Sequence, residues 1–254
     1  MILTSLLPKD LIRSSSLLVM ALLSLGWLAP LSAAPVLKLE DVKLKSTYPV
    51  KTNIVTTYFW IGQGSSGYNS TTNYASAWDM RWTKNFGGVD QPYKRGAAPA
   101  GRVTLPTRFA PTRNPYYVAL PFNDVKYPKL AAKHVPWWNA EFAKKNRWRS
   151  QCKGRWIMIE YNGKVCFAQW EDVGPLRYDH VGYVFGKERP TREHSNAGLD
   201  VSPAVRDYLG LTGLNKTNWR FVEDDEVPYG PWIEYGEQAI IFSAIKAEKL
   251  NTLN

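Results

Sequence analysis

The chain has 254 residues, with 32 Lys and Arg against 22 Asp and Glu, which gives a net charge of +10. Its 11 Trp, 14 Tyr and 9 Phe are enough to build a hydrophobic core, so the composition excludes a disordered chain. Only 2 Cys and 3 His are present, which excludes a disulfide-dense miniprotein and a multi-cysteine zinc site. We therefore expect no metal and no organic cofactor.

Residues 1–34 have the order of an export signal. Lys9 and Arg13 precede an almost wholly apolar stretch over 16–31, and small residues follow at 32–34. A single membrane anchor is the alternative, but the apolar run is short for a membrane span. The sequence predicts an exported protein, periplasmic or extracellular, with no transmembrane segment after signal cleavage.

The rest of the chain is typical of a protein built from short strands. An N-terminal extension over 35–53 begins with alternating apolar and charged residues, which indicates an edge strand or a tether. Asn162 and Gly163 favour a two-residue hairpin turn, because both positions of that turn need a positive φ. The predicted strands, in chain order, cover 55–61, 116–120, 155–161, 165–170 and 219–222.

Helical signals are few. The clearest helix follows Ser202, a good N-cap, and begins with Pro203 at the first helical position. Gly210 can end it. Shorter or weaker helices are predicted over 137–148 and 238–249. Many short strands with few helices predict a small β-barrel or sandwich.

The two cysteines are expected to pair, because an exported protein enters an oxidising compartment. The hairpin register complicates the pairing of Cys152 with Cys166. In that register Cys166 faces Ile159, so the chain around Cys152 must fold back over the hairpin to form the disulfide.

Two acidic segments, 170–175 and 198–203, each place an aspartate where a strand ends and the chain turns. The aspartates are Asp172 and Asp200. Two carboxylates on one rim of a barrel can act as acid and base on a glycosidic bond. The alternative for each aspartate is a structural role, in a turn or at a helix cap.

These segments resemble a known superfamily. Asp172-Val-Gly-Pro175 and Leu199-Asp-Val-Ser202, with the following Leu209-Gly210, resemble the rare lipoprotein A-like lytic transglycosylases. Thr57-Tyr-Phe-Trp60 resembles the opening strand of expansins and family-45 glycoside hydrolases. All of these, with the barwin-like proteins, belong to the double-psi β-barrel superfamily.

The resemblance implies a mainly β fold: a six-stranded double-psi β-barrel over 54–225, with short helices and an insertion over 127–150. A C-terminal extension covers 226–254. It also implies an exported protein that binds a cell-wall, peptidoglycan-like polysaccharide, either a lytic transglycosylase or a glycosidase. The alternatives are a non-catalytic expansin- or barwin-like binding module and a structural envelope protein. The implied catalytic residues are Asp200 and Asp172, and the implied substrate-binding residues are Tyr58, Trp60, Trp170 and Tyr178.

The basic charge fits an anionic cell-wall polysaccharide as the partner. A membrane surface or a nucleic acid would also attract a basic protein. No nucleic-acid-binding motif is present, and the basic residues are spread along the chain, so nucleic acid is not expected. The stretch over 137–149 mixes aromatic and basic groups, which indicates either a binding surface or a helix with a solvated basic face: Trp137, Trp138, Lys144, Lys145, Arg147, Trp148 and Arg149.

Overall fold

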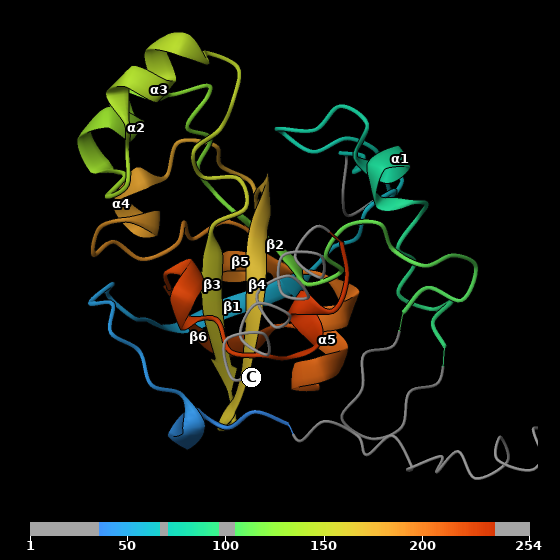
Figure 1. Ribbon diagram of the computed structural model, residues 1–254. Coiled ribbons are helices and arrows are strands. Elements are labelled where there is room, and N and C mark those ends of the chain that lie inside the picture. The colour runs from blue at the N-terminus through green and yellow to red at the C-terminus, as the bar shows by residue number, and fades with distance from the viewer. Residues whose placement is uncertain (1–35, 67–70, 97–104, 237–254) are drawn as a thin grey trace, which may run out of the picture. The chain divides into compact units, whose positions relative to one another are not determined.

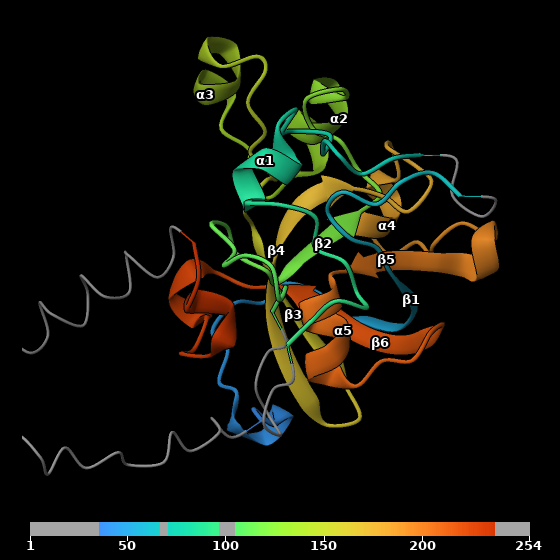
Figure 2. The ribbon, with the colours of Figure 1, turned by 90° about the vertical axis from the view of Figure 1, so that its right-hand side faces the viewer.

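The computed structural model describes residues 36–66, 71–96 and 105–236. These residues contain a closed six-stranded β-barrel (Figures 1 and 2). The predicted export signal over 1–34 and the predicted helix over 238–249 lie outside the described residues. The strands are β1 (Lys51–Tyr58), β2 (Tyr117–Leu120), β3 (Trp156–Tyr161), β4 (Lys164–Val173), β5 (Ala197–Val201) and β6 (Asn215–Phe221).

The barrel closes in the order β1-β5-β2-β4-β3-β6. Two pairs are parallel, β1 with β5 and β2 with β4, and the remaining neighbours are antiparallel. A mixed sheet of this kind needs long connections between parallel neighbours, and most of the helices lie in them. The prediction of a mainly β, six-stranded barrel with short helices is confirmed.

The helices are short and lie in the connections. They are α1 (Trp82–Phe86), α2 (Pro128–His134), α3 (Ala140–Lys145), α4 (Val181–Val184) and α5 (Pro203–Leu209). Four 3-10 turns are η1 (Leu39–Asp41), η2 (His194–Asn196), η3 (Asp224–Glu226) and η4 (Pro231–Ile233). Within the described ranges, none of the helices has the length and apolar character needed to cross a membrane.

The local signals for the hairpin and for α5 are confirmed. Asn162 and Gly163 have φ values of 51° and 77°, and Cys166 pairs with Ile159. The Ser202 hydroxyl accepts a hydrogen bond of 3.3 Å from the Val205 amide at the start of α5. The helix ends at Gly210, whose φ of 77° lies in the left-handed region.

Two other expectations change in detail. The N-terminal extension from residue 36 forms no strand before β1, and only Lys38 makes an isolated bridge, to Lys164. It is therefore a tether on the barrel. The helix predicted over 137–148 is confined to α3, because Asn139 caps it by accepting from the Phe142 amide.

The expected disulfide is not formed: Cys152 and Cys166 are both buried and free. Cys166 lies near the turn of the β3–β4 hairpin, opposite Ile159. Cys152 precedes β3 at the other end of the hairpin, where its amide donates to Asp124 at 3.2 Å. The chain does not fold back over the hairpin, so the two thiols stay near opposite ends of it.

Two apolar clusters face opposite sides of the β2 strand. Val118 and Leu120 point into the barrel core. Tyr117 and Ala119 point outward and are covered by the connection that follows β1. The residues of that connection that pack on the outer face are Phe59, Ile61, Trp82 and Phe86.

Candidate functional site

The two predicted catalytic aspartates lie on the same outer face of the barrel, one on each side of β2. Ala119 on β2 pairs with Asp172 on β4 and with Asp200 on β5. Asp200 in turn pairs with Thr57 on β1. Directly paired residues point to the same face of a sheet, so the four residues form one row across four strands. Two strand spacings separate the aspartate Cα atoms, roughly 10 Å.

A bulge in β4 decides which way Asp172 points. Trp170 pairs with Val118 and Asp172 pairs with Ala119, so Glu171 is an extra residue in the ladder. In a regular strand Trp170 and Asp172 would share a face, because side chains alternate with a period of two. The bulge sends Trp170 into the core and Asp172 to the outer face.

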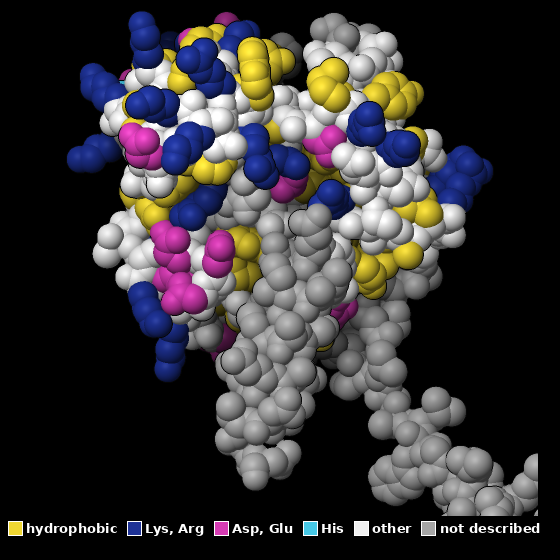
Figure 3. All heavy atoms as spheres, turned by 45° about the horizontal axis from the view of Figure 1, so that its top comes forward, with side chains coloured by type: hydrophobic (Ala, Val, Ile, Leu, Met, Phe, Trp, Pro, Cys, Tyr) yellow, Lys and Arg dark blue, Asp and Glu magenta, His cyan; other side chains and the backbone are white. Residues whose placement is uncertain are grey.

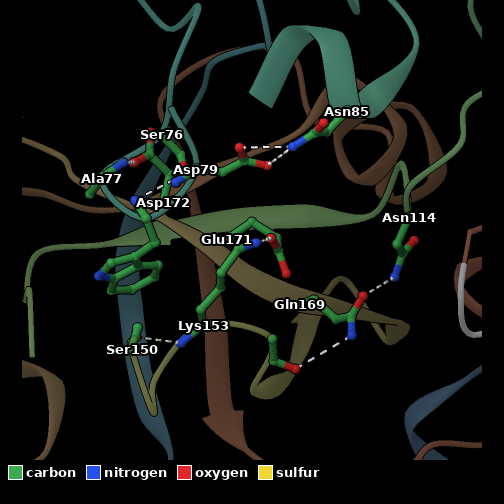
Figure 4. Close-up of polar contacts among 12 residues, drawn as sticks. Ser76, Ala77, Asp79, Asn85, Asn114, Ser150, Lys153, Gln169, Glu171 and Asp172 are labelled. Carbon is green, nitrogen blue, oxygen red and sulfur yellow. Dashed lines mark hydrogen bonds and ion pairs between the residues drawn. The ribbon is translucent and has the colours of Figure 1, made fainter. Parts of the chain in front are cut away.

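Asp172 is nearly closed off by the loop before α1, with 8% of its surface exposed. One carboxylate oxygen accepts an amide hydrogen bond of 2.8 Å from Ala77 (Figure 4). The same oxygen accepts a second one of 2.8 Å from the Val173 amide. Burial raises the pKa of the Asp172 carboxyl to about 7, against the lowering effect of these two amides. The charge of Asp200 raises this pKa further, which means that the two carboxylates interact.

Asp200 is half-buried and more open to solvent than Asp172. The Thr57 hydroxyl donates a hydrogen bond to its carboxylate. Burial raises the pKa of Asp200 to about 6, and the Thr57 bond opposes the shift. Gly174 passes close by: a Cβ placed on it would lie 3.6 Å from one Asp200 oxygen. Because Gly174 has no side chain, there is space beside the Asp200 carboxylate.

Of the predicted substrate-binding aromatics, Tyr58 and Trp60 lie together at the end of β1. Their rings stack with centroids 6.3 Å apart, and the Arg206 guanidinium lies 4.9 Å from the centre of the Tyr58 ring. The Tyr58 hydroxyl is 3.3 Å from that of Tyr93, and this bond is the main cause of a raised Tyr58 pKa. Both rings are half-buried, so these neighbours take up ring surface that a sugar would otherwise contact.

The other two aromatics differ sharply in exposure. Tyr178 is 40% exposed, and its ring lies 5.3 Å from the Lys126 ammonium. Trp170 is fully buried in the barrel core, and its indole nitrogen donates to the Asp172 carbonyl at 2.8 Å. The placement of Trp170 in a substrate site is therefore corrected: the bulge at Glu171 turns it inward, where no polymer reaches it.

A cavity of about 380 Å³ lies further along the same outer face, and neither aspartate lines it. Glu171 on the bulge lines it, and its carboxylate is 3.5 Å from the Lys153 ammonium. Burial raises the pKa of Glu171, while Lys153 and Arg113 lower it. The sequence did not indicate this cavity, because its lining comes from segments that lie far apart in the chain. The remaining lining residues are Ile61, Trp82, Phe86, Arg113, Asn114, Tyr117, Gly154, Arg155, Gln169 and Asp224.

Within the described ranges, no cluster of three or more His, Cys, Asp or Glu is placed to hold a metal ion. Two carboxyls with raised pKa values on one face can give and take protons near neutral pH.

The fold and this site define a class: a closed, mixed six-stranded β-barrel with an acidic pair on its outer face. No family model matches the sequence, and a comparison with curated proteins gave no match. Among solved structures, the chain is similar to Streptomyces papain inhibitor (SPI), at 15% sequence identity. That match covers 72% of this chain and 100% of the other chain, with a TM-score of 0.28. A likeness of this size carries no argument about function.

Proposed function

We propose that this is an exported protein that binds a peptidoglycan-like cell-wall glycan and cleaves a glycosidic bond in it. Asp200 acts as the acid and base, and Asp172 supports it. The observation that carries the proposal is the pairing of both aspartates with Ala119, which puts two interacting carboxyls on one outer face.

The protonation of the pair suits this chemistry. A carboxyl with a pKa of about 6 keeps a fraction of its protons at neutral pH and can donate one to a leaving glycosidic oxygen. Once ionised, it can accept a proton from water or from a sugar hydroxyl. Asp200 is the more exposed of the two, and Gly174 leaves space beside it. Asp172 raises the cost of a second negative charge on the same face.

The proposal includes the finer fold type and the location. We assign the barrel to the double-psi type on the resemblance of 172–175 and 199–202, and the two parallel strand pairs support this assignment. Export, to the periplasm or the cell exterior, rests on the sequence pattern of 1–34. The net basic charge favours an anionic glycan over a neutral one.

A non-catalytic binding module is the second candidate, and one observation favours it. Asp172 is 8% exposed, and one of its oxygens accepts two backbone amides. That is the environment of a carboxylate that holds a loop in place. In this version the same outer face binds the glycan, and no bond is broken.

Incubating the exported form with purified peptidoglycan and with β-glucan separates these versions, with soluble products analysed by mass. Anhydro-ended fragments indicate transglycosylase chemistry, and reducing-ended fragments indicate hydrolysis. Asp200→Asn should abolish either product while the protein still sediments with the polymer. Asp41→Asn, which changes an exposed carboxyl on η1, is the matched control and should leave the products unchanged.

If the protein sediments with the polymer and releases no product, the enzyme hypothesis is rejected in favour of the non-catalytic binding module. Absence of both sedimentation and product would overturn the glycan proposal as a whole.

A further inference from the structure

The connection between β2 and β3 contains a strongly basic lobe, defined here as residues 126–149, which includes α2 and α3. It holds seven Lys or Arg against one acidic residue, Glu141. All seven are exposed, and none forms an ion pair in the described part of the chain. Figure 3 shows Lys and Arg side chains gathered at the upper left, the side on which α2 and α3 lie in Figure 1. The seven are Lys126, Lys129, Lys133, Lys144, Lys145, Arg147 and Arg149.

The lobe also exposes Trp148, between Arg147 and Arg149. Its side chain is 88% exposed, whereas the other nine Trp in the described ranges are buried or half-buried. Exposing an indole to water forfeits the free energy of burying a large apolar group. Trp is enriched at the boundary between lipid and water, where its ring meets acyl chains and its N–H meets water.

This exposure belongs to an ordered lobe that is held at its base. The Asp124 carboxylate accepts hydrogen bonds of 2.7 Å from the Ser150 hydroxyl and 2.6 Å from the Gln151 amide. The Gln151 side chain makes two hydrogen bonds to the backbone of Asn139, of 2.8 and 3.0 Å. Trp137 packs its ring 4.9 Å from that of Phe221 in the core. The barrel therefore presents Trp148 and the cations in a fixed arrangement.

We propose that the basic lobe docks on the surface of an anionic lipid bilayer, with Trp148 at headgroup depth and the Lys and Arg side chains against lipid phosphates. The lobe stands out from one end of the barrel (Figures 1 and 2). No residue of the lobe lines either of the cavities described in the structure, so the lobe presents a projecting surface and not a cleft. A projecting, cationic surface tipped by an indole fits a flat anionic surface instead.

The proposal is independent of the proposed glycan chemistry, because it uses a different surface. The test is sedimentation of the full chain with vesicles of phosphatidylcholine alone or mixed with phosphatidylglycerol. Lys144→Glu with Lys145→Glu should weaken binding to the mixed vesicles on the order of tenfold or more, because each lost cation removes attraction to the surface. Higher salt should weaken wild-type binding.

The matched control is Lys43→Glu with Lys216→Glu, which makes the same charge change at two exposed lysines outside the lobe. Because every variant keeps residues 1–34, differences between variants report on the lobe. Brominated phosphatidylglycerol, which quenches indoles near the acyl chains, should quench wild type more than Trp148→Phe.

Three results would overturn the proposal: unchanged binding of the Lys144→Glu, Lys145→Glu variant to the mixed vesicles, an equal loss in the control variant, or quenching unaffected by Trp148→Phe. Binding of the lobe to a soluble polyanionic polysaccharide or RNA, without vesicle binding, would assign it to a polymer instead.

Discussion

Asp172 and Asp200 are held on the same outer face of the barrel by the strand that separates them. β2 is parallel to β4 and antiparallel to β5, and both aspartates pair with its Ala119. The side chain between them is a single methyl group, which lies buried beneath the connection that follows β1. The charge of Asp200 raises the pKa of Asp172, so Asp200→Asn should lower the pKa of Asp172.

Asp200 should make the protein less stable as the pH rises. Its folded pKa of about 6 lies above the ordinary value of 3.8 for an aspartate, so the native state binds this proton more tightly than the unfolded chain does. The resulting loss of unfolding free energy grows between pH 4 and pH 6, reaches about 3 kcal/mol and remains at higher pH. Asp200→Asn removes it. Urea unfolding of both proteins across this range should show wild type losing stability relative to the variant; a constant difference would contradict the raised pKa.

Removing the Thr57 hydroxyl should raise the pKa of Asp200 further, because that hydrogen bond favours the ionised form. Thr57→Val keeps the shape of the side chain and removes the donor. Thr57→Ser keeps the donor and serves as the control. Carbon NMR of the labelled aspartate carboxyl gives the titration directly, and an unchanged pKa in Thr57→Val would mean that the bond does not form in solution.

Trp170 and Tyr178 should separate stability from binding. Trp170→Ala opens a cavity in the core and should cost about 3–5 kcal/mol of unfolding free energy. Tyr178→Ala changes an exposed ring and should cost less than about 1 kcal/mol, while weakening sedimentation with the glycan. Urea unfolding and polymer pull-down on the same samples test both. Weaker binding by the folded fraction of Trp170→Ala would return this residue to the substrate site.

Ser202 caps α5 and should contribute about 1 kcal/mol to the free energy of unfolding, because its hydroxyl accepts a hydrogen bond from the Val205 amide. It also accepts from the Tyr117 amide at 3.4 Å, so the loss reaches β2 as well. Ser202→Ala should lower the unfolding free energy by this amount or somewhat more. Ser202→Thr retains the oxygen and should recover most of it.

Both cysteines should be free thiols that are shielded from reagents in the native protein. Burial raises the pKa of Cys152 and of Cys166 well above the ordinary value, so neither should react quickly with a thiol reagent in the native protein. Two free thiols should appear in denaturant without a reductant. Finding none would mean that the disulfide expected from the sequence forms after all, with a rearrangement near Cys152.

Elements with strong local chemistry were predictable. The β3–β4 hairpin follows from Asn162 and Gly163, and α5 follows from its Ser202 cap and Gly210 stop, because these residues act within one turn of chain. For β5, the sequence indicated a strand end at Asp200 but no bounds for the strand. Its Ala, Gly and Asp residues are poor strand formers, and it exists because β1 and β2 pair with it on both sides.

The positions of the site residues depended on a feature that sequence patterns do not carry. The two aspartates could be picked out as a pair, but their common face could not, because the face of Asp172 is set by one extra residue, Glu171, opposite β2. The same bulge explains why Trp170, two residues before Asp172, was wrongly grouped with it in the substrate site. Register errors of one residue reverse the face of every following side chain.

The pair of hydrogen bonds between Asn139 and Gln151 closes the base of the tip of the basic lobe, residues 140–149. Because the chain enters and leaves the tip at these two residues, residues 140–149 can change in length or sequence while the barrel stays closed. A change at the tip of the lobe should therefore leave the row formed by Thr57, Ala119, Asp172 and Asp200 unaltered, so the two surfaces can be varied independently in one protein.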